Sequence, residues 1–170
     1  MKFEKVSLEQ FTEDYLRCKG FHDDVDLDEE TAKEIIKIYS DIQLPKRGTK
    51  FSAGYDFFMP YWVKFNHKKE TLIPTGVRFK CDSDKYLECV PRSGLGFKYG
   101  MGLRNTIGVI DSDYYNSNNE GHIMAKIICD EDFELEKGKG FMQGIISKYY
   151  LVEDDDSEGV RDGGFGSTGV

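Results

Sequence analysis

The sequence predicts an all-β fold, either a barrel or a sandwich, preceded by a short helical extension. From Phe51 onward, short runs rich in Val, Ile, Phe and Tyr alternate with Gly, Pro, Asn and Asp, which is typical of strands joined by turns. No helical pattern of ten or more residues interrupts these runs, so repeating βαβ units are not expected. A chain of 170 residues is expected to form one domain whose core needs no disulfide or metal.

Two amphipathic helices are predicted before the β region. The first covers residues 8–18, because Ser7 and Gln10 have the spacing of a capping box. The second is predicted after Asp26, with Glu29 at the reciprocal capping position. Its apolar stripe, at helical spacing, consists of Ala32, Ile35, Ile36 and Tyr39. We expect this stripe either to pack on the main domain or to dock a partner.

Strands are predicted throughout the main domain. They cover residues 61–66, 71–80, 85–90, 106–111, 121–129 and 141–152. Turns are expected at 131–132 and 137–138. The run EDDDSE follows, and the glycine-rich end GGFGSTGV cannot pack as a regular element. The chain therefore divides into a helical extension at 1–44, a β domain at 45–152, and an acidic linker with a glycine-rich arm at 153–170.

The composition excludes several classes of partner. Acidic residues outnumber basic ones by 31 to 23, whereas proteins that bind nucleic-acid polymers carry a basic surface. A small polyphosphate is still compatible with a net charge of −8. No apolar run approaches the ~18 residues of a membrane span, and the N-terminus lacks an apolar secretion signal. We expect no nucleic-acid polymer, no membrane, a cytoplasmic location and reduced cysteines at Cys18, Cys81, Cys89 and Cys129.

Familiar nucleotide and hydrolase motifs are absent from the sequence. It contains no Gly-Lys-Ser/Thr of a phosphate-binding P-loop, and no complete GxGxxG. Neither HExxH nor GxSxG occurs, so histidine-based hydrolysis has little support. The three histidines, His22, His67 and His122, are scattered and are expected at the surface.

Five glycine-flanked polar clusters are left as candidates for chemistry. In order, they are SAGYD from Ser52, PRSGLG from Pro91, NTIGVIDSDYY from Asn105, GKGFMQ from Gly138, and GGFGSTG after Arg161. An arginine, a hydroxyl and an accessible backbone N–H on one loop, as in the second cluster, suit a phosphate group. In the third, Asp111 directly follows an apolar strand, so it is either a structural partner of an arginine or a general base. The fifth cluster has one aromatic residue, Phe165, among glycines and hydroxyl residues. This composition is typical of a flap that wraps a phosphate group and stacks one aromatic ring.

The five clusters, in this order, resemble the five motifs of the trimeric dUTP pyrophosphatase (dUTPase) family. The resemblance covers roughly residues 45–170 and leaves out the N-terminal helices. It implies a jelly-roll β-barrel and a homotrimer whose active sites are shared between subunits. It also implies Mg²⁺-dependent hydrolysis of dUTP to dUMP and pyrophosphate. Such an activity would cleanse the nucleotide pool and supply dUMP for thymidylate synthesis.

The resemblance assigns a role to each matching residue. Asp111 matches the general base that activates water for in-line attack on the α-phosphorus. Tyr114 matches the ring under the deoxyribose, and Asn105 and Gly108 lie in the hairpin that reads uracil. Asp56 matches the acid that holds the metal through water. The residues that match phosphate ligands are Arg92, Ser93, Gly94 and Gln143. Those in the C-terminal arm are Arg161, Phe165, Gly166, Ser167 and Thr168, with Phe165 stacking on uracil.

The sequence departs from the family pattern at three places. Gly140 stands where the family usually has an arginine, and Arg161 lies one residue closer than usual to the arm's phenylalanine. The extra residues YNSNNE lengthen the loop after Tyr114. Two alternatives stay open on the same fold: a dUTP-binding regulatory protein with weak or no catalysis, and a related deaminase acting on dCTP.

Overall fold

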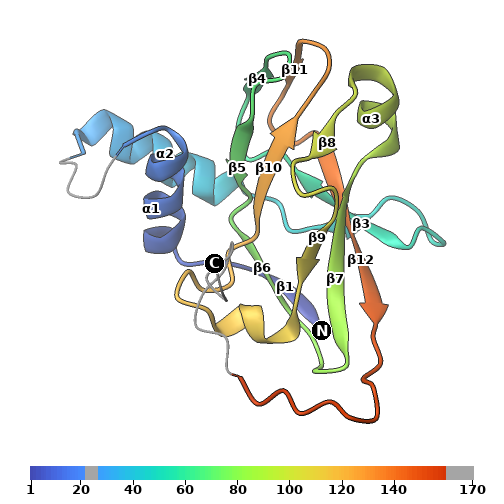
Figure 1. Ribbon diagram of the computed structural model, residues 1–170. Coiled ribbons are helices and arrows are strands. Elements are labelled where there is room, and N and C mark those ends of the chain that lie inside the picture. The colour runs from blue at the N-terminus through green and yellow to red at the C-terminus, as the bar shows by residue number, and fades with distance from the viewer. Residues whose placement is uncertain (22–26, 160–170) are drawn as a thin grey trace.

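The computed structural model describes residues 1–21 and 27–159 and confirms the all-β class (Figure 1). The strands are β1 (Lys2–Lys5), β2 (Lys46–Arg47), β3 (Gly54–Phe58), β4 (Val63–Phe65), β5 (Thr71–Pro74), β6 (Val77–Lys80), β7 (Lys85–Pro91), β8 (Gly102–Leu103), β9 (Gly108–Ile110), β10 (Met124–Ile128), β11 (Phe133–Leu135) and β12 (Gly140–Lys148). The largest sheet has the order β2-β3-β12-β7-β9, and a second has the order β5-β10-β8. The further pairs are β1-β6 and β4-β11. Every pairing among the described strands is antiparallel, as expected for a barrel without βαβ units.

The predicted N-terminal helices both form, with one correction at a cap. The helices are α1 (Leu8–Cys18), α2 (Glu29–Asp41), α3 (Ser93–Tyr99) and the short 3-10 helix η1 (Ser112–Asn116). Ser7 Oγ accepts from the N–H of Gln10 at 3.0 Å, as predicted. In α2, Asp28 Oδ1 accepts from the N–H of Thr31 at 2.8 Å, so Asp28 is the cap rather than Asp26. A capping carboxylate must reach the amide three residues on, and α2 begins immediately after Asp28.

The strand predictions are right for the long apolar runs and wrong in detail. The single strand predicted at 71–80 is two strands, because Thr75 and Gly76 break it. Gly76 has a φ of +71°, and a Cβ there would collide with Ile42. The last strand ends at Lys148 rather than at residue 152. The strands that lie outside the predicted ranges are β1, β2, β3, β8 and β11, each of only two to five residues.

The helical extension packs on the barrel. Strand β1 pairs with β6, and Figure 1 shows both helices on one side of the barrel beside β5. Ile35, Ile38 and Ile42 are buried in the common core, whereas Ile36 is 52% exposed. The buried face of α2 therefore contains Ile38 in place of the predicted Ile36. The fully buried aromatic residues of the core are Phe11, Phe57, Phe65, Phe79 and Phe141. The division of the chain at residues 44 and 152 stays a prediction.

One histidine is not where the sequence suggested. His122 is completely buried, although a surface position was expected. Its two ring nitrogens are bonded to Asp14 and to the backbone of Gly76, and burial of a polar ring is stable when both nitrogens have partners. His67 is exposed as expected, and His22 lies outside the described residues. None of the described helices is long and apolar enough to cross a membrane.

Candidate active site

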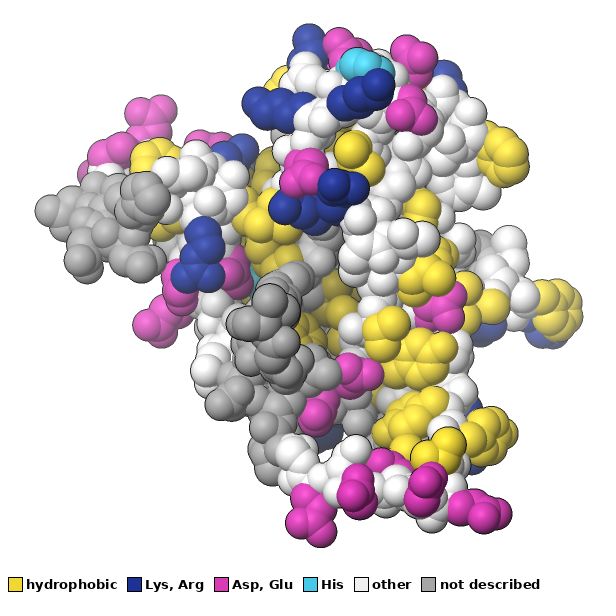
Figure 2. Space-filling model, viewed as in Figure 1, with side chains coloured by type: hydrophobic (Ala, Val, Ile, Leu, Met, Phe, Trp, Pro, Cys, Tyr) yellow, Lys and Arg dark blue, Asp and Glu magenta, His cyan; other side chains and the backbone are white. Residues whose placement is uncertain are grey.

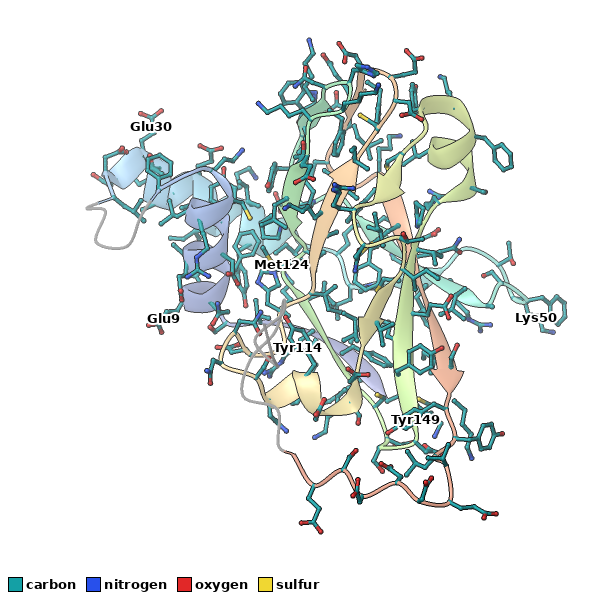
Figure 3. The ribbon with its side chains drawn as sticks, in the orientation of Figure 1. Glu9, Glu30, Lys50, Tyr114, Met124 and Tyr149 are labelled. Atoms are coloured by element: carbon teal, nitrogen blue, oxygen red, sulfur yellow. The ribbon has the colours of Figure 1, made fainter. Side chains whose placement is uncertain are left out.

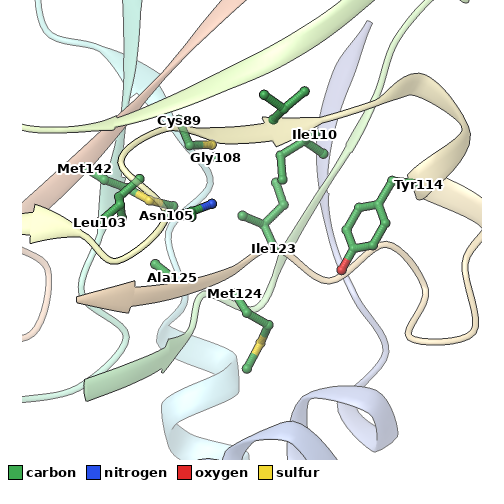
Figure 4. A pocket seen from close by; sticks show the side chains of 11 residues that line it. Cys89, Leu103, Asn105, Gly108, Ile110, Tyr114, Ile123, Met124, Ala125 and Met142 are labelled. Carbon is green, nitrogen blue, oxygen red and sulfur yellow. The ribbon is translucent and has the colours of Figure 1, made fainter. Parts of the chain in front are cut away.

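A pocket of about 190 Å³ lies beside the turn that joins β8 to β9, two strands that pair in different sheets (Figure 4). We call the segment 102–110 the hairpin and this cavity the hairpin pocket. It is lined by Cys89, Leu103, Asn105, Gly108, Val109, Ile110, Tyr114, Ile123, Met124, Ala125 and Met142. The structure thus brings together three residues that the sequence singled out, Asn105, Gly108 and Tyr114. Figure 4 shows Ile123 between Asn105 and Tyr114, so most of the wall between the two polar side chains is apolar.

The tight turn of the hairpin sets the position of Asn105. Thr106 has a φ of +67°, a conformation that residues other than glycine rarely adopt. Its N–H donates to Leu103 O at 2.9 Å, and the N–H of Ile107 donates to Asn105 O at 2.7 Å. These two bonds hold the strained turn, which is typical of a functional loop.

Gly108 lets the hairpin lie close to the neighbouring strand. It pairs with Cys89 of β7, and a Cβ at position 108 would lie 3.1 Å from the Cys89 Cβ. A side chain here would push β9 away from β7 and change the shape of the pocket. Burial raises the pKa of the Cys89 thiol to about 12, so this wall of the pocket is uncharged at neutral pH.

Asp111 and Tyr114 lie directly after β9, in the segment that forms η1. Ile110 ends β9 and lines the pocket, and the next residue, Asp111, is the N-cap of η1. Asp111 is half-buried, and its carbonyl accepts from the N–H of Tyr114 at 3.2 Å. The Tyr114 ring is buried, and its hydroxyl donates to His122 O at 2.9 Å and accepts from Asn119 Nδ2 at 2.8 Å. Hydrogen bonds therefore fix the ring in the wall of the pocket.

A second group of predicted residues gathers around Arg92. The Arg92 Nε lies 3.4 Å from Asp56 Oδ1, and its backbone N–H donates to Phe141 O at 3.1 Å. Gln143 of β12 is the direct pairing partner of Asp56 in β3. Its side chain reaches over β3, since a Cβ at Gly54 would collide with Gln143 Oε1. We call Asp56, Arg92, Ser93, Gly94 and Gln143 the arginine cluster.

The neighbourhood of Arg92 explains the glycine at position 140. Arg92 Nη1 donates to Gly140 O at 3.4 Å, and a Cβ at position 140 would lie 2.5 Å from the same nitrogen. The Arg92 side chain therefore occupies the space that a larger residue at 140 would need. Ser93 and Gly94 begin α3 beside a shallow exposed depression, and a Cβ at Gly94 would meet no atom within 4 Å.

Within one chain, the hairpin pocket and the arginine cluster do not form a single site. No member of the arginine cluster lines the hairpin pocket. Among residues 1–21 and 27–159, no three His, Cys, Asp or Glu side chains gather in a way that could hold a metal ion. The arm residues Arg161, Phe165, Gly166, Ser167 and Thr168 lie outside the described residues.

Sequence reasoning missed the apolar half of the pocket. Its walls include Leu103, Ile123, Ala125 and Met142. The alternation of Ile123, Ala125 and Ile127 in the strand predicted at 121–129 was a usable signal, because residues two apart share one face of a strand. Leu103 gave no such signal, since β8 has only two residues.

The fold and the site define a class of protein: an all-β barrel with a largely apolar pocket, an aspartate next to that pocket, and a separate cluster around Arg92. The chain belongs to the dUTPase family, whose model matches residues 40–169. This confirms the resemblance drawn from the five motifs and the prediction of a hydrolase of that family.

Relatives with curated names support the same conclusion. The deoxyuridine 5'-triphosphate nucleotidohydrolase of Lactococcus lactis is 38% identical over 144 residues, covering 81% of this chain and 96% of that protein. The protein of the same name from Arabidopsis thaliana is 38% identical over 142 residues, covering 81% and 82%. The crystal structure of the Streptococcus mutans dUTPase has a TM-score of 0.64 at 29% identity, covering 90% of this chain and 99% of that one. The predicted jelly roll is thereby confirmed.

Proposed function

We propose that this protein hydrolyses dUTP to dUMP and pyrophosphate. The observation that carries the proposal is the hairpin pocket, where Asn105, Gly108 and Tyr114 meet beside Asp111. The named relatives, all deoxyuridine 5'-triphosphate nucleotidohydrolases, support the same substrate. Removal of dUTP from the nucleotide pool and supply of dUMP for thymidylate synthesis follow from this reaction.

The pocket has the chemistry to bind a uracil nucleoside. Its apolar walls suit the faces of a pyrimidine ring, and Asn105 and the backbone at Gly108 supply donors and acceptors for one edge. A base with the wrong donors would leave these groups unpaired, which discriminates strongly against cytosine. The Tyr114 ring, fixed by its hydroxyl, lies under the deoxyribose and leaves no space for a 2′-hydroxyl.

Asp111 acts as the general base. Its carboxylate takes a proton from a water molecule, and the water oxygen forms a bond to the α-phosphorus as the bond to the bridging oxygen of the β-phosphate breaks. Pyrophosphate leaves with the bridging oxygen, and the proton stays on Asp111 until it passes to solvent. A position at the end of β9 and the start of η1 gives this carboxylate a fixed backbone.

The arginine cluster binds the triphosphate. The guanidinium of Arg92, the hydroxyl of Ser93, the backbone at Gly94 and the amide of Gln143 supply donors for phosphate oxygens. Asp56 holds Arg92 in place at 3.4 Å and gives an acidic oxygen for the hydrated metal region. Arg161, Phe165, Gly166, Ser167 and Thr168 of the arm close over the substrate, with Phe165 on the uracil.

A magnesium ion fits this donor set only through the substrate. Mg²⁺ keeps several waters and is usually bound by one or two carboxylates together with substrate phosphates. Asp56 is the acid that we assign to this role, and among the described residues no three His, Cys, Asp or Glu side chains gather to bind an ion directly. The ion would neutralise charge on the triphosphate and orient it for in-line attack.

A homotrimer would bring the two groups together. The hairpin pocket and the arginine cluster lie apart in one chain, so a neighbouring subunit would supply the cluster. Figure 2 shows hydrophobic side chains gathered over the β7–β9–β12 side of the molecule. Phe51 and Phe97 are 90% and 94% exposed, and exposed apolar surface of this kind marks protein–protein contact.

The test is pyrophosphate release from dUTP, dCTP, dTTP and UTP, each with Mg²⁺ and with a chelator. We expect rapid release from dUTP alone and its loss with chelator. Tight dUTP binding without release would contradict the proposal and support a regulatory protein. Ammonia release from dCTP would instead support the deaminase.

A further inference from the structure

The N-terminal segment is bonded to the loop that carries Tyr114. We call residues 112–121 the tyrosine loop; it contains the extra residues YNSNNE. Strand β1, Ser7 and helix α1 contact this loop or the residue that follows it, His122. Figure 3 shows Tyr114 and Met124 between α1 and β9, with Glu9 at the outer side of α1.

The central contact is a buried pair of Asp14 and His122. His122 Nδ1 lies 2.7 Å from Asp14 Oδ2, and the side chains are 0% and 5% exposed. The N–H of Gly76 donates to His122 Nε2 at 2.7 Å, so this nitrogen is the acceptor and the ring proton lies on Nδ1. Gln10 Nε2 also donates to Asp14 Oδ2, at 2.9 Å. The imidazole is therefore held at both nitrogens by groups outside the tyrosine loop.

The same residue, His122, also supplies the contact that fixes Tyr114. The carbonyl of His122 accepts the hydroxyl hydrogen of Tyr114 at 2.9 Å and also accepts from Asn119 Nδ2 at 3.3 Å. The position of the carbonyl depends on the position of the His122 backbone, which the buried ring sets. A short covalent and hydrogen-bonded path thus runs from Asp14 on α1 to the phenol of Tyr114.

Two further contacts hold the ends of the loop insertion. The hydroxyl of Tyr115 donates to Glu4 Oε2 of β1 at 2.6 Å, and the N–H of Ser7 donates to Glu120 Oε2 at 2.8 Å. The Arg78 guanidinium stacks over the Tyr115 ring at 4.4 Å. Glu120 itself has a φ of +56°, a strained conformation that persists only where neighbouring contacts enforce it.

We infer that the N-terminal segment acts as a clamp that positions Tyr114 through Asp14 and His122. The lengthened loop and the helical extension are then two parts of one device: the insertion would loosen the sugar wall, and the clamp restores it. Asp14 and His122 are positioning residues, since they act through Tyr114. The inference rests on the proposed function for its effect on substrate choice, but the clamp itself exists without substrate.

The kinetic test uses Asp14→Ala in the full chain. We expect the preference for dUTP over UTP to fall by roughly tenfold to a hundredfold, because a small displacement of a positioned group has such effects. KM for dUTP should rise more than kcat falls, since Asp111 directly follows β9, whose position is set by its pairing with β7. Asp14→Asn keeps an acceptor for His122 and should recover most of the preference. Glu13→Ala, one residue away and exposed on the same helix, is the matched control.

A second measurement, hydrogen exchange, does not depend on catalytic activity. Hydrogen exchange of the amides of residues 112–121 should be faster in Asp14→Ala and in Tyr115→Phe than in the wild type and Glu13→Ala. Tyr115→Phe removes only one hydroxyl at a partly exposed site, so folding is preserved. Unchanged exchange in both variants, or an unchanged dUTP-to-UTP ratio in a folded Asp14→Ala, overturns the clamp. Absence of dUTP hydrolysis in the wild type would refute the proposed function instead, and exchange would still decide the clamp.

Discussion

At the scale of single residues, the position of Asp111 separates its role from that of the neighbouring acid. Asp111 is half-buried at the junction of the pocket wall and η1, whereas Asp113, two residues on, is exposed. A general base must stay close to the reacting water, and Asp111 directly follows Ile110, which lines the pocket.

Asp111→Asn is expected to keep the fold and lower turnover at least a thousandfold, because an amide cannot accept the proton. A thousandfold loss corresponds to only about 4 kcal/mol of activation free energy. Single-turnover pyrophosphate release measures it, and Asp113→Asn is the matched control. Near wild-type release by Asp111→Asn would show that another group is the base.

Gly108→Ala tests the close approach of β9 to β7. The new Cβ would lie 3.1 Å from the Cys89 Cβ, and overpacking of this kind costs about 1–3 kcal/mol. We expect a lower melting temperature and a higher KM for dUTP, because the hairpin pocket changes shape. Gly102→Ala in the same hairpin meets no atom within 4 Å and should change neither quantity. Equal behaviour of the two variants would contradict a steric role for Gly108.

At the scale of elements, local patterns predicted what depends on neighbours in sequence. The Ser7 cap, helix 8–18 and the strand at β7 follow from residues within one run. The burial of His122 could not be predicted, because its partner Asp14 lies 108 positions earlier in the chain. The predicted site residues were found by motif, but their separation into a hairpin pocket and an arginine cluster depends on strand order, which no local pattern reveals.

Asp14 on helix α1 should make the stability of the protein decrease in acid. Burial alone would raise the pKa of Asp14, but hydrogen bonds from His122 and Gln10 outweigh it and hold the pKa below its ordinary value. As pH falls below about 4, the unfolded chain takes up a proton before the folded one does, so the free energy of unfolding decreases. The slope for one such group is at most about 1.4 kcal/mol per pH unit.

Denaturant unfolding between pH 5 and the lowest pH at which the protein stays soluble measures this contribution. Asp14→Asn should show a flatter decline than the wild type in this window, because it lacks the titrating group. Glu13→Gln removes an exposed carboxyl from the same helix and should follow the wild type. Parallel curves for the wild type and Asp14→Asn would show that Asp14 does not titrate differently on folding.

At the scale of the whole molecule, the separation of the hairpin pocket from the arginine cluster is the reason for proposing a homotrimer. Among the described residues, the hairpin pocket has no phosphate-binding side chains, and the arginine cluster has no pocket for a pyrimidine ring. Each is therefore only part of the proposed site, and both belong to the same chain. In the proposed homotrimer, threefold symmetry would let the cluster of each subunit face the pocket of the next, so that every subunit would use both groups. Under this proposal the trimer would be part of the active site and not only a source of stability.

Mixed trimers of two inactive variants test this arrangement directly. Asp111→Asn removes the base, and Arg92→Ala removes the phosphate ligand, so each homotrimer should be nearly inactive. When equal amounts are unfolded and refolded together, random assembly with threefold symmetry gives about a quarter of sites an intact Asp111 from one subunit and an intact Arg92 from the next. Pyrophosphate release should recover to that fraction of wild type, whereas simple mixing without refolding should recover less. If both residues served one site within a chain, no assortment of subunits could restore activity.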